Sequence, residues 1–252
     1  MACCVISATA FAQTKYGHGV FWGRLVLSDT VNSRLKWELY LQTRSQSAGT
    51  GNIFAERHYV AMVPWLGYKL NNNTKVFLSP LSYFNSHVFY NNVSEVRPEG
   101  VKEYRISARI ENEQKLRHFN YTNRYALEYR MRDLAHNGIY QPNWRARYQF
   151  KLEKPLFNIF SKEKPLSVFL SEEILIQYGK AVRNNPNIFD QNRINVGASY
   201  EVVKNVKFTA SYLNILQQRI SGKEVDEAHT LWMIFTFENL FSQFKKHNNH
   251  NQ

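Results

Sequence analysis

Strict alternation of apolar and polar residues, sustained over about ten residues at a time, is the feature that most constrains the fold of this chain. Successive side chains of a β-strand point to opposite sides, so each alternating segment has one apolar and one polar face. Strands of soluble sheets are usually about five or six residues long, whereas a tilted strand needs about 9 to 11 residues to cross a bilayer. The alternation therefore predicts long strands with one face for lipid and one for water.

The clearest alternating segment covers residues 34–44. Its apolar face carries Leu35, Trp37, Leu39 and Leu41, and its polar face carries Arg34, Lys36, Glu38, Gln42 and Arg44. Residues 102–113 repeat this pattern with little noise. Strong and weak segments together make eleven candidate strands, at residues 20–27, 34–44, 54–70, 75–84, 102–113, 118–132, 143–153, 167–178, 191–202, 206–217 and 229–237.

These strands are expected to close into a barrel, because lipid offers no hydrogen-bond partners to the free backbone groups of a strand edge. No apolar stretch approaches the roughly 20 residues of a spanning helix, and a sheet in lipid must have no open edge. Short turns, as at residues 71–73 and 204–205, alternate with longer connections, as at residues 85–100 and 179–190. Bacterial single-chain barrels have an even number of strands. We therefore expect an all-β protein, a closed antiparallel up-and-down transmembrane β-barrel of about twelve strands, with ten as the alternative.

The N-terminal residues indicate export. Residues 1–12 are uncharged and mostly small or apolar, and they end in Ala10-Phe11-Ala12, which matches a signal-peptidase site. The usual basic residues are missing, which leaves open a signal peptide truncated at its start or a plain unstructured terminus. We interpret residues 1–12 as a signal peptide, 13–239 as an outer-membrane barrel and 240–252 as a polar tail. Both cysteines, Cys3 and Cys4, precede the cleavage site, so we expect no disulfide and no thiolate metal site.

The basic excess of the chain is distributed rather than clustered. Thirty-two Lys and Arg against twenty Asp and Glu give a net charge of +12, which in a soluble protein would suggest a nucleic-acid partner. Here most basic residues alternate along the strands and are interleaved with acids, so we expect no nucleic acid. The polar faces instead predict a charge network in the lumen, made of Arg105, Arg109, Glu111, Arg124, Glu128, Arg130, Arg145, Arg147 and Arg193.

Two roles are open for this network. Arginine and glutamate on adjacent strands can pair across the wall, which would fill a narrow lumen and fix the strand register. Alternatively, an excess of arginine would form a positive constriction for small anionic solutes. We interpret the five tryptophans, Trp22, Trp37, Trp65, Trp144 and Trp232, as aromatic girdles at the membrane interfaces, with carbohydrate or lipid stacking as the alternative.

Several of these residues resemble a known family. The run Glu95-Val96-Arg97-Pro98-Glu99-Gly100, the later Tyr104-Arg105, Arg109-Ile110-Glu111, Arg124 and Tyr129-Arg130, and the segment 189–197 after Glu172 and Glu173 are similar to the family called domain of unknown function 2490. The resemblance covers nearly the whole chain after residue 12. It implies an outer-membrane β-barrel of a Gram-negative bacterium, and it implies no activity and no catalytic positions.

Signals for catalysis are weak. The sequence has no His-Glu-x-x-His metal helix, no Gly-x-Ser-x-Gly elbow and no phosphate loop. Ser86-His87 and His229-Thr230 are the pairs that a lipid hydrolase could use. We expect no enzymatic activity, no cofactor and no metal, and we expect a structural or small-solute pore protein in contact with outer-membrane lipid. A lipid-acting enzyme and a soluble β-sheet binding protein are the alternatives.

Overall fold

A computed structural model describes residues 14–156 and 166–245, and these residues form one closed barrel of eleven long strands. The predicted signal peptide and residues 157–165 and 246–252 lie outside the described residues. Each of the eleven alternating segments lies within or overlaps one strand. The strands are β1 (Thr14–Thr30), β2 (Leu35–Gln46), β3 (Glu56–Lys69), β4 (Thr74–Ser86), β5 (Val101–Lys115), β6 (Asn120–Asp133), β7 (Gln141–Leu156), β8 (Leu166–Tyr178), β9 (Phe189–Val203), β10 (Val206–Gln218) and β11 (Glu224–Phe237).

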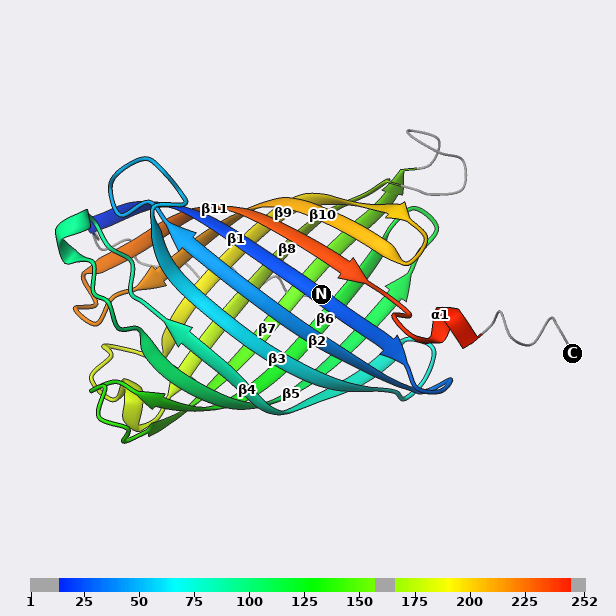
Figure 1. Ribbon diagram of the computed structural model, residues 1–252, viewed down its shortest axis with the longest axis horizontal. Coiled ribbons are helices and arrows are strands. Elements are labelled where there is room, and N and C mark those ends of the chain that lie inside the picture. Colours follow the sequence, from blue (N-terminus) through cyan, green and yellow to red (C-terminus); the bar gives the residue numbers. More distant parts are fainter. Residues whose placement is uncertain (1–13, 157–165, 246–252) are drawn as a thin grey trace, which may run out of the picture.

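The connections separate into two kinds at the two ends of the barrel (Figure 1). One end, here the loop end, carries the connections 47–55, 87–100, 134–140, 179–188 and 219–223. Two of them contain short 3-10 helices, η1 (Val93–Glu95) and η2 (Lys180–Val182). The other end, here the turn end, carries the connections 31–34, 70–73, 116–119 and 204–205. The predicted alternation of turns and longer loops is therefore present in the fold.

Asparagine side chains build two of the tight turns. Asn32 Oδ1 accepts hydrogen bonds from the backbone N–H groups of Arg34 (2.9 Å) and Leu35 (2.8 Å). Asn71 Oδ1 does the same for Asn73 (2.9 Å) and Thr74 (2.8 Å). A short side chain that bonds its own backbone two residues on stabilises a turn without a ladder partner. The turn-forming chemistry in the sequence thus fixes where consecutive strands reverse.

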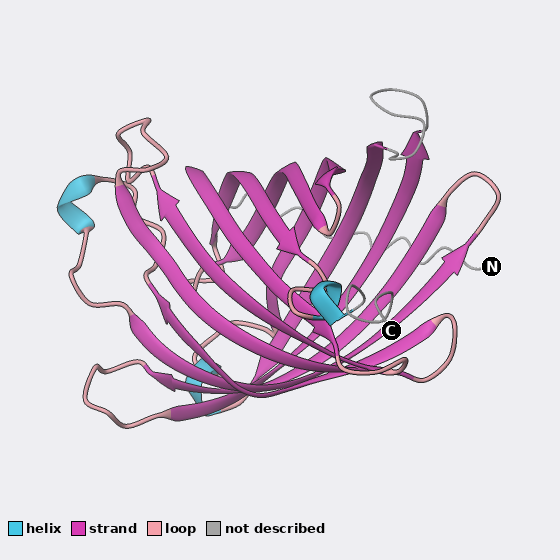
Figure 2. Ribbon diagram, turned by 45° about the vertical axis from the view of Figure 1, so that its right-hand side comes forward, coloured by secondary structure: helices cyan, strands magenta, loops and turns pink. Residues whose placement is uncertain are grey.

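The barrel closes through a parallel pair. Consecutive strands pair antiparallel around the wall, and β1 then pairs β11 in parallel, from Thr14 opposite Glu224 to Leu27 opposite Phe237. An odd number of up-and-down strands leaves the first and the last pointing the same way, so their contact must be parallel. The closed barrel is confirmed, and its eleven strands fall between the expected ten and twelve. Figure 2 shows the strongly curved strands of this wall.

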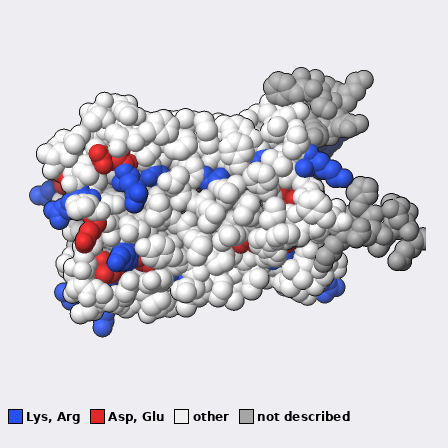
Figure 3. All heavy atoms as spheres, viewed as in Figure 1, with Lys and Arg blue, Asp and Glu red and all other residues white. Residues whose placement is uncertain are grey.

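The outer surface of the wall is apolar over its middle. Strands β2 to β11 all place exposed aliphatic or aromatic side chains outward, among them Leu41, Leu66, Leu78, Ile106, Leu127, Phe150, Leu170, Val196, Tyr212 and Phe235. On the face seen in Figure 3, Lys, Arg, Asp and Glu gather towards the two ends, and few lie between them. In the part of the chain that the structure describes, no helix is long and apolar enough to span a membrane.

The first residues of the predicted polar tail lie against the turn end. Asp29 Oδ2, near the end of β1, accepts hydrogen bonds from the backbone N–H groups of Phe241 (2.7 Å) and Ser242 (2.9 Å). The short helix α1 (Ser242–Lys245) begins there. The ring of Phe241 lies 6.2 Å from that of Trp37. These contacts hold the C-terminal side of β11 beside the β1–β2 turn.

Candidate functional site

Two of the cavities that the described residues line lie inside the barrel. The larger has a volume of about 790 Å³ and extends to the loop end, where residues of the 87–100, 179–188 and 219–223 connections line it. The smaller has a volume of about 260 Å³ and is lined by residues near the turn end, including Asn73, Lys75 and Glu113. Arg124 and Gln149 line both cavities. The two spaces therefore meet at these two side chains.

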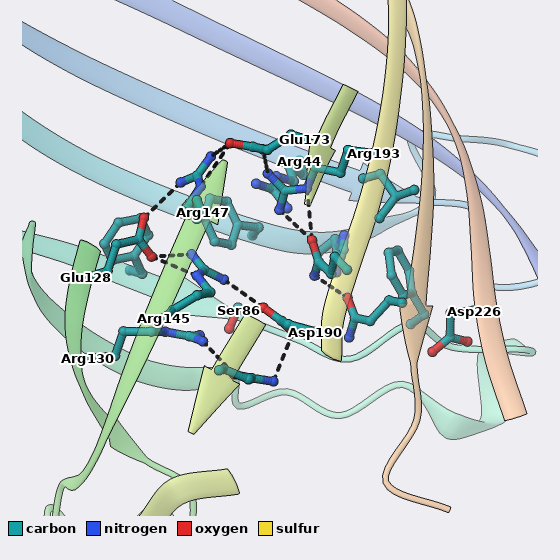
Figure 4. A pocket seen from close by; sticks show the side chains of 18 of the residues that line it. Arg44, Ser86, Glu128, Arg130, Arg145, Arg147, Glu173, Asp190, Arg193 and Asp226 are labelled. Carbon is teal, nitrogen blue, oxygen red and sulfur yellow. Dashed lines mark hydrogen bonds and ion pairs between the residues drawn. The ribbon is translucent and has the colours of Figure 1, made fainter. Parts of the chain in front are cut away.

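Buried carboxylates bridge arginines of neighbouring strands along one side of the larger cavity (Figure 4). Glu128 of β6 accepts from Arg145 Nη2 at 2.6 Å and from Arg147 Nη1 at 2.8 Å. Glu173 of β8 accepts from Arg147 Nη2 at 2.5 Å and from Arg193 Nη1 at 3.1 Å. Arg147 of β7 thus joins two carboxylates, and the chain of charges runs across four strands, β6 to β9.

The network continues to β5 and to the loop end. Glu103 is 1% exposed, and it takes two hydrogen bonds from Arg130, at 2.7 and 2.8 Å, and a further contact from Arg105. Arg145 Nη1 also reaches Asp190 at 3.3 Å. Removal of one partner from such a buried pair costs about 3–5 kcal/mol, because the other charge stays buried and unpaired. Loss of any one member of these pairs should therefore destabilise this wall.

The network residues named from the sequence all lie inside the barrel. Eight of them line the larger cavity, and Glu111 lines the smaller one, where it accepts from Arg124 at 2.8 Å. Arg109 connects this group to β2, because its Nη2 lies 3.3 Å from Glu38 Oε2. The eight residues at the larger cavity are Arg105, Arg109, Arg124, Glu128, Arg130, Arg145, Arg147 and Arg193.

Four arginines that line the larger cavity were not among the predicted network residues, namely Arg24, Arg44, Arg132 and Arg219. Two of them lie on β1 and β2. Arg24 of β1 donates to Gln42 Oε1 at 3.0 and 2.8 Å. Arg44 lies on β2, and its guanidinium carbon is 3.4 Å from the centroid of the Trp22 ring and 4.0 Å from that of the Tyr59 ring. Within the described residues, neither arginine forms an ion pair. Among the eleven arginines that line the larger cavity, these two have no carboxylate partner in the described residues.

The girdle prediction is wrong for three of the five tryptophans. Trp22, Trp65 and Trp232 line the larger cavity, and Trp22 is only 2% exposed. Trp22 and Trp232 stack on each other with centroids 4.6 Å apart and an interplanar angle of 16°. Trp144 points outward, as a girdle residue would. The lumen therefore has an aromatic side on β1, β3 and β11. Arginines of the ion-paired side on β5 to β9 reach it, since the guanidinium carbon of Arg193 lies 5.7 Å from the Trp22 centroid and that of Arg109 lies 4.4 Å from the Trp65 centroid.

The 87–100 connection folds inward at the loop end, and we call residues 87–91 the inner loop. Phe89 packs with Trp22, Leu213 and Ile215, and Tyr90 is 3% exposed. The buried side chain of Gln46 holds this segment, because its Nε2 donates to Val88 O at 2.9 Å and its Oε1 accepts from Tyr90 N at 2.9 Å. The inner loop therefore narrows the entrance to the larger cavity.

Charged and titratable side chains surround the same entrance. Arg219 donates to Asp226 Oδ1 at 2.6 Å, and this hydrogen bond raises the pKa of Arg219. Burial lowers the pKa of His87, and the nearby charge of Arg57 lowers it further. Arg219 is thus balanced by Asp226, and the lowered pKa of His87 disfavours a charged imidazole at the entrance.

The two pairs considered for hydrolase chemistry have other contacts. His87 Nδ1 lies 3.1 Å from Tyr90 Oη, in the inner loop. His229 lies on the exposed outer face, and its Nδ1 is 2.6 Å from Tyr212 Oη. Thr230, its neighbour in the chain, points to the opposite side and is fully buried. A nucleophile needs a base within hydrogen-bond reach, and His229 and Thr230 lie on opposite faces of β11.

Fold and interior together define a closed β-barrel protein with an arginine-rich lumen. A comparison with known families matches residues 20–226 to the family described as "Protein of unknown function (DUF2490)", and the chain belongs to this family. This match confirms the family resemblance that the sequence motifs indicated. No curated protein and no solved structure matches the chain.

Proposed function

We propose that this chain is an integral outer-membrane β-barrel of a Gram-negative bacterium and that its lumen admits small anionic solutes. The proposal has two parts, the membrane location and the lumen, and each has its own support. It includes contact with outer-membrane lipid, and it includes no nucleic acid, no cofactor and no catalytic step.

The membrane location is supported by a distribution of side chains opposite to that of a soluble protein, with charged residues inside and apolar residues outside. Glu103, Glu128 and Glu173 are at most 5% exposed, whereas five outward aliphatic side chains on the same strands are 42–51% exposed, namely Ile106, Ile110, Leu127, Leu170 and Ile174. Soluble monomers rarely expose a contiguous apolar patch larger than a few hundred Å², and a band around a whole barrel exceeds that. Lipid accepts such a band, and water accepts the polar interior.

The sign of the lumen charge supports the second part. The larger cavity is lined by eleven arginines and by six carboxylates, Glu95, Glu128, Glu173, Asp190, Glu224 and Asp226. Three further carboxylates, those of Glu38, Glu103 and Glu111, pair with lining arginines from the wall. The arginines still exceed these nine carboxylates, and a positive constriction favours anions over cations.

Most of the arginines also have a structural role. Arg145, Arg147 and Arg130 are engaged by buried carboxylates, so their charges are largely balanced where they stand. The same network therefore fixes the register of β5 to β9 and forms one side of the solute path. A purely structural barrel is the competing function, and it predicts no passage of solute.

Ion selectivity of the purified protein tests the proposal. The barrel is reconstituted into a planar bilayer under a potassium chloride gradient, and the reversal potential is measured. We expect channel steps and a reversal potential shifted from zero towards the equilibrium potential of chloride. Loss of selectivity in the Arg24→Gln/Arg44→Gln double variant, with steps retained, would support the role of the unpaired arginines. Absence of steps, or a preference for potassium, would contradict the pore.

A further inference from the structure

The aromatic side of the lumen contains a row of side chains that crosses three neighbouring strands. Trp22 of β1 is the register partner of Arg44 of β2, and Arg44 is the register partner of Tyr59 of β3. The guanidinium carbon of Arg44 lies 3.4 Å from the Trp22 centroid and 4.0 Å from the Tyr59 centroid. Cation–π contacts of this kind position a guanidinium without neutralising its charge. Arg44 is thus held in place by aromatic rings and not by a carboxylate.

A second cation extends the row. The guanidinium carbon of Arg24 lies 4.8 Å from the centroid of Trp232 and 5.2 Å from that of Tyr40. Arg24 is two residues from Trp22 on the same face of β1, and the two indoles are stacked. Two arginine side chains thus lie against four aromatic side chains, and in the described residues no carboxylate pairs with either arginine.

Hydrogen-bond donors without acceptors gather at the same place. Arg44 Nε, Gln42 Nε2, Trp22 Nε1 and Trp232 Nε1 are all buried and have no hydrogen-bond partner in the described residues. Trp22 itself is only 2% exposed. Buried N–H groups in proteins are nearly always paired, so a cluster of unpaired donors beside two cations indicates an acceptor that comes from outside the chain. An oxyanion supplies both the acceptor atoms and the negative charge.

The remaining surface of the cavity defines the rest of the ligand. Val63, Trp65, Phe84, Leu213 and Ile215 line the same space as Arg24 and Arg44. The volume of about 790 Å³ is in the range of small-molecule sites, which are mostly apolar with a few placed polar groups. On the ion-paired side, the arginines already bind Glu128 and Glu173, so an anion there would compete with the chain's own carboxylates. The ligand needs an apolar body and one anionic end.

We infer that Arg24, Arg44, Gln42 and the Trp22–Trp232 pair form a binding site for a small organic carboxylate with a flat apolar body. The carboxylate binds at the guanidinium groups of Arg24 and Arg44, which line the cavity, and the body lies on the aromatic side of the cavity. This inference rests on the proposed function in one respect, since it requires a lumen that solutes can enter.

Calorimetric titration of the full-length protein in detergent micelles tests the inference without any need for conduction. The probes are benzoate, benzamide as its uncharged counterpart, and inorganic phosphate as an anion without an apolar body. We expect benzoate to bind, and we expect benzamide and phosphate to bind at least about tenfold more weakly, because a hydrogen bond to a charged group is stronger than one between neutral groups and phosphate has no apolar body. Equal binding of benzamide or of phosphate would overturn the ligand class.

Matched arginine variants locate the site. Arg44→Gln should weaken benzoate binding roughly tenfold or more, and Arg44→Lys should retain part of it, because lysine keeps the charge and loses the fork. Arg132→Gln is the control, because Arg132 lines the same cavity and lies 3.7 Å from Glu103 rather than at the aromatic row. The heat-dependent gel mobility of each variant verifies that the barrel is folded. Unchanged binding in Arg44→Gln, or an equal loss in Arg132→Gln, would overturn the site.

Failure of this site and failure of the proposed function give different results. A barrel that conducts anions and does not bind benzoate would overturn the carboxylate site and leave the anion pore. A barrel that binds benzoate with the expected variant pattern and shows no channel steps would overturn the pore and support the site.

Discussion

Glu172 and Glu173 are adjacent in β8 and have opposite surroundings. Glu173 is 5% exposed inside the barrel, where it accepts from Arg147 at 2.5 Å and from Arg193 at 3.1 Å. Glu172 lies on the exposed outer face, where it accepts from Asn192 Nδ2 at 2.8 Å. Period-two geometry alone separates the two carboxylates. Two adjacent glutamates therefore report on the two sides of the wall, Glu173 on the inside and Glu172 on the outside.

Replacement of each glutamate by leucine should have unequal effects. Glu173→Leu leaves Arg147 and Arg193 without their shared carboxylate, and we expect a loss of about 3–5 kcal/mol in barrel stability. Glu172→Leu adds an apolar side chain to an apolar face, and we expect a change within about 1 kcal/mol. The temperature at which the folded gel band disappears measures both. Equal shifts for the two variants would contradict the assignment of inside and outside.

The fold was predictable because its signal is local. In β2 and β5 each second residue is charged or polar, so the two faces can be read directly from residues 34–44 and 102–113. The inward positions of Arg105 and Arg109 follow from that period alone. Eleven segments were visible, and the structure has eleven strands. The even-number rule nevertheless pointed to a twelfth strand. An odd number is possible here because β1 and β11 pair in parallel, and this contact joins residues about 210 positions apart, which no local pattern reveals.

The aromatic part of the site was only partly predictable. Trp22 shares a face of β1 with His18 and Arg24, so period two favours an inward position, and only the general preference of tryptophan for membrane interfaces pointed outward. Arg44 was assigned to a polar face, but its lack of a carboxylate partner depends on which strands flank β2. Asp190 lies at the border of a loop, where period two has no meaning, and yet it pairs with Arg145.

The inner loop should open when its anchor is removed. Gln46→Ala deletes the two hydrogen bonds to Val88 and Tyr90, each contributing about 1 kcal/mol, and leaves the strand ladder intact. We expect faster proteolysis within residues 87–91 and a larger single-channel conductance. Gln114→Ala is the control, because Gln114 bonds Asn112 near the turn end. If Gln46→Ala matches the control in both measurements, the inner loop does not narrow the entrance.

Cysteine pairs can test the parallel closure of β1 on β11. Phe21 lies opposite Leu231, and Leu25 lies opposite Phe235. Neighbouring strands are about 4.8 Å apart, which is close enough for a disulfide. In a chain with Cys3 and Cys4 replaced by serine, we expect oxidative cross-links for the 21/231 and 25/235 pairs, detected by gel mobility. Cross-links for the crossed pairs 21/235 and 25/231 instead would mean an antiparallel closure.

Membrane fractionation with gel mobility before and after boiling tests the central claim most directly. The account predicts that the protein is recovered with the outer membrane, requires detergent for extraction, and migrates faster before boiling than after it, because a closed barrel resists unfolding by detergent. Recovery in the soluble fraction, with one mobility before and after boiling, would contradict the account.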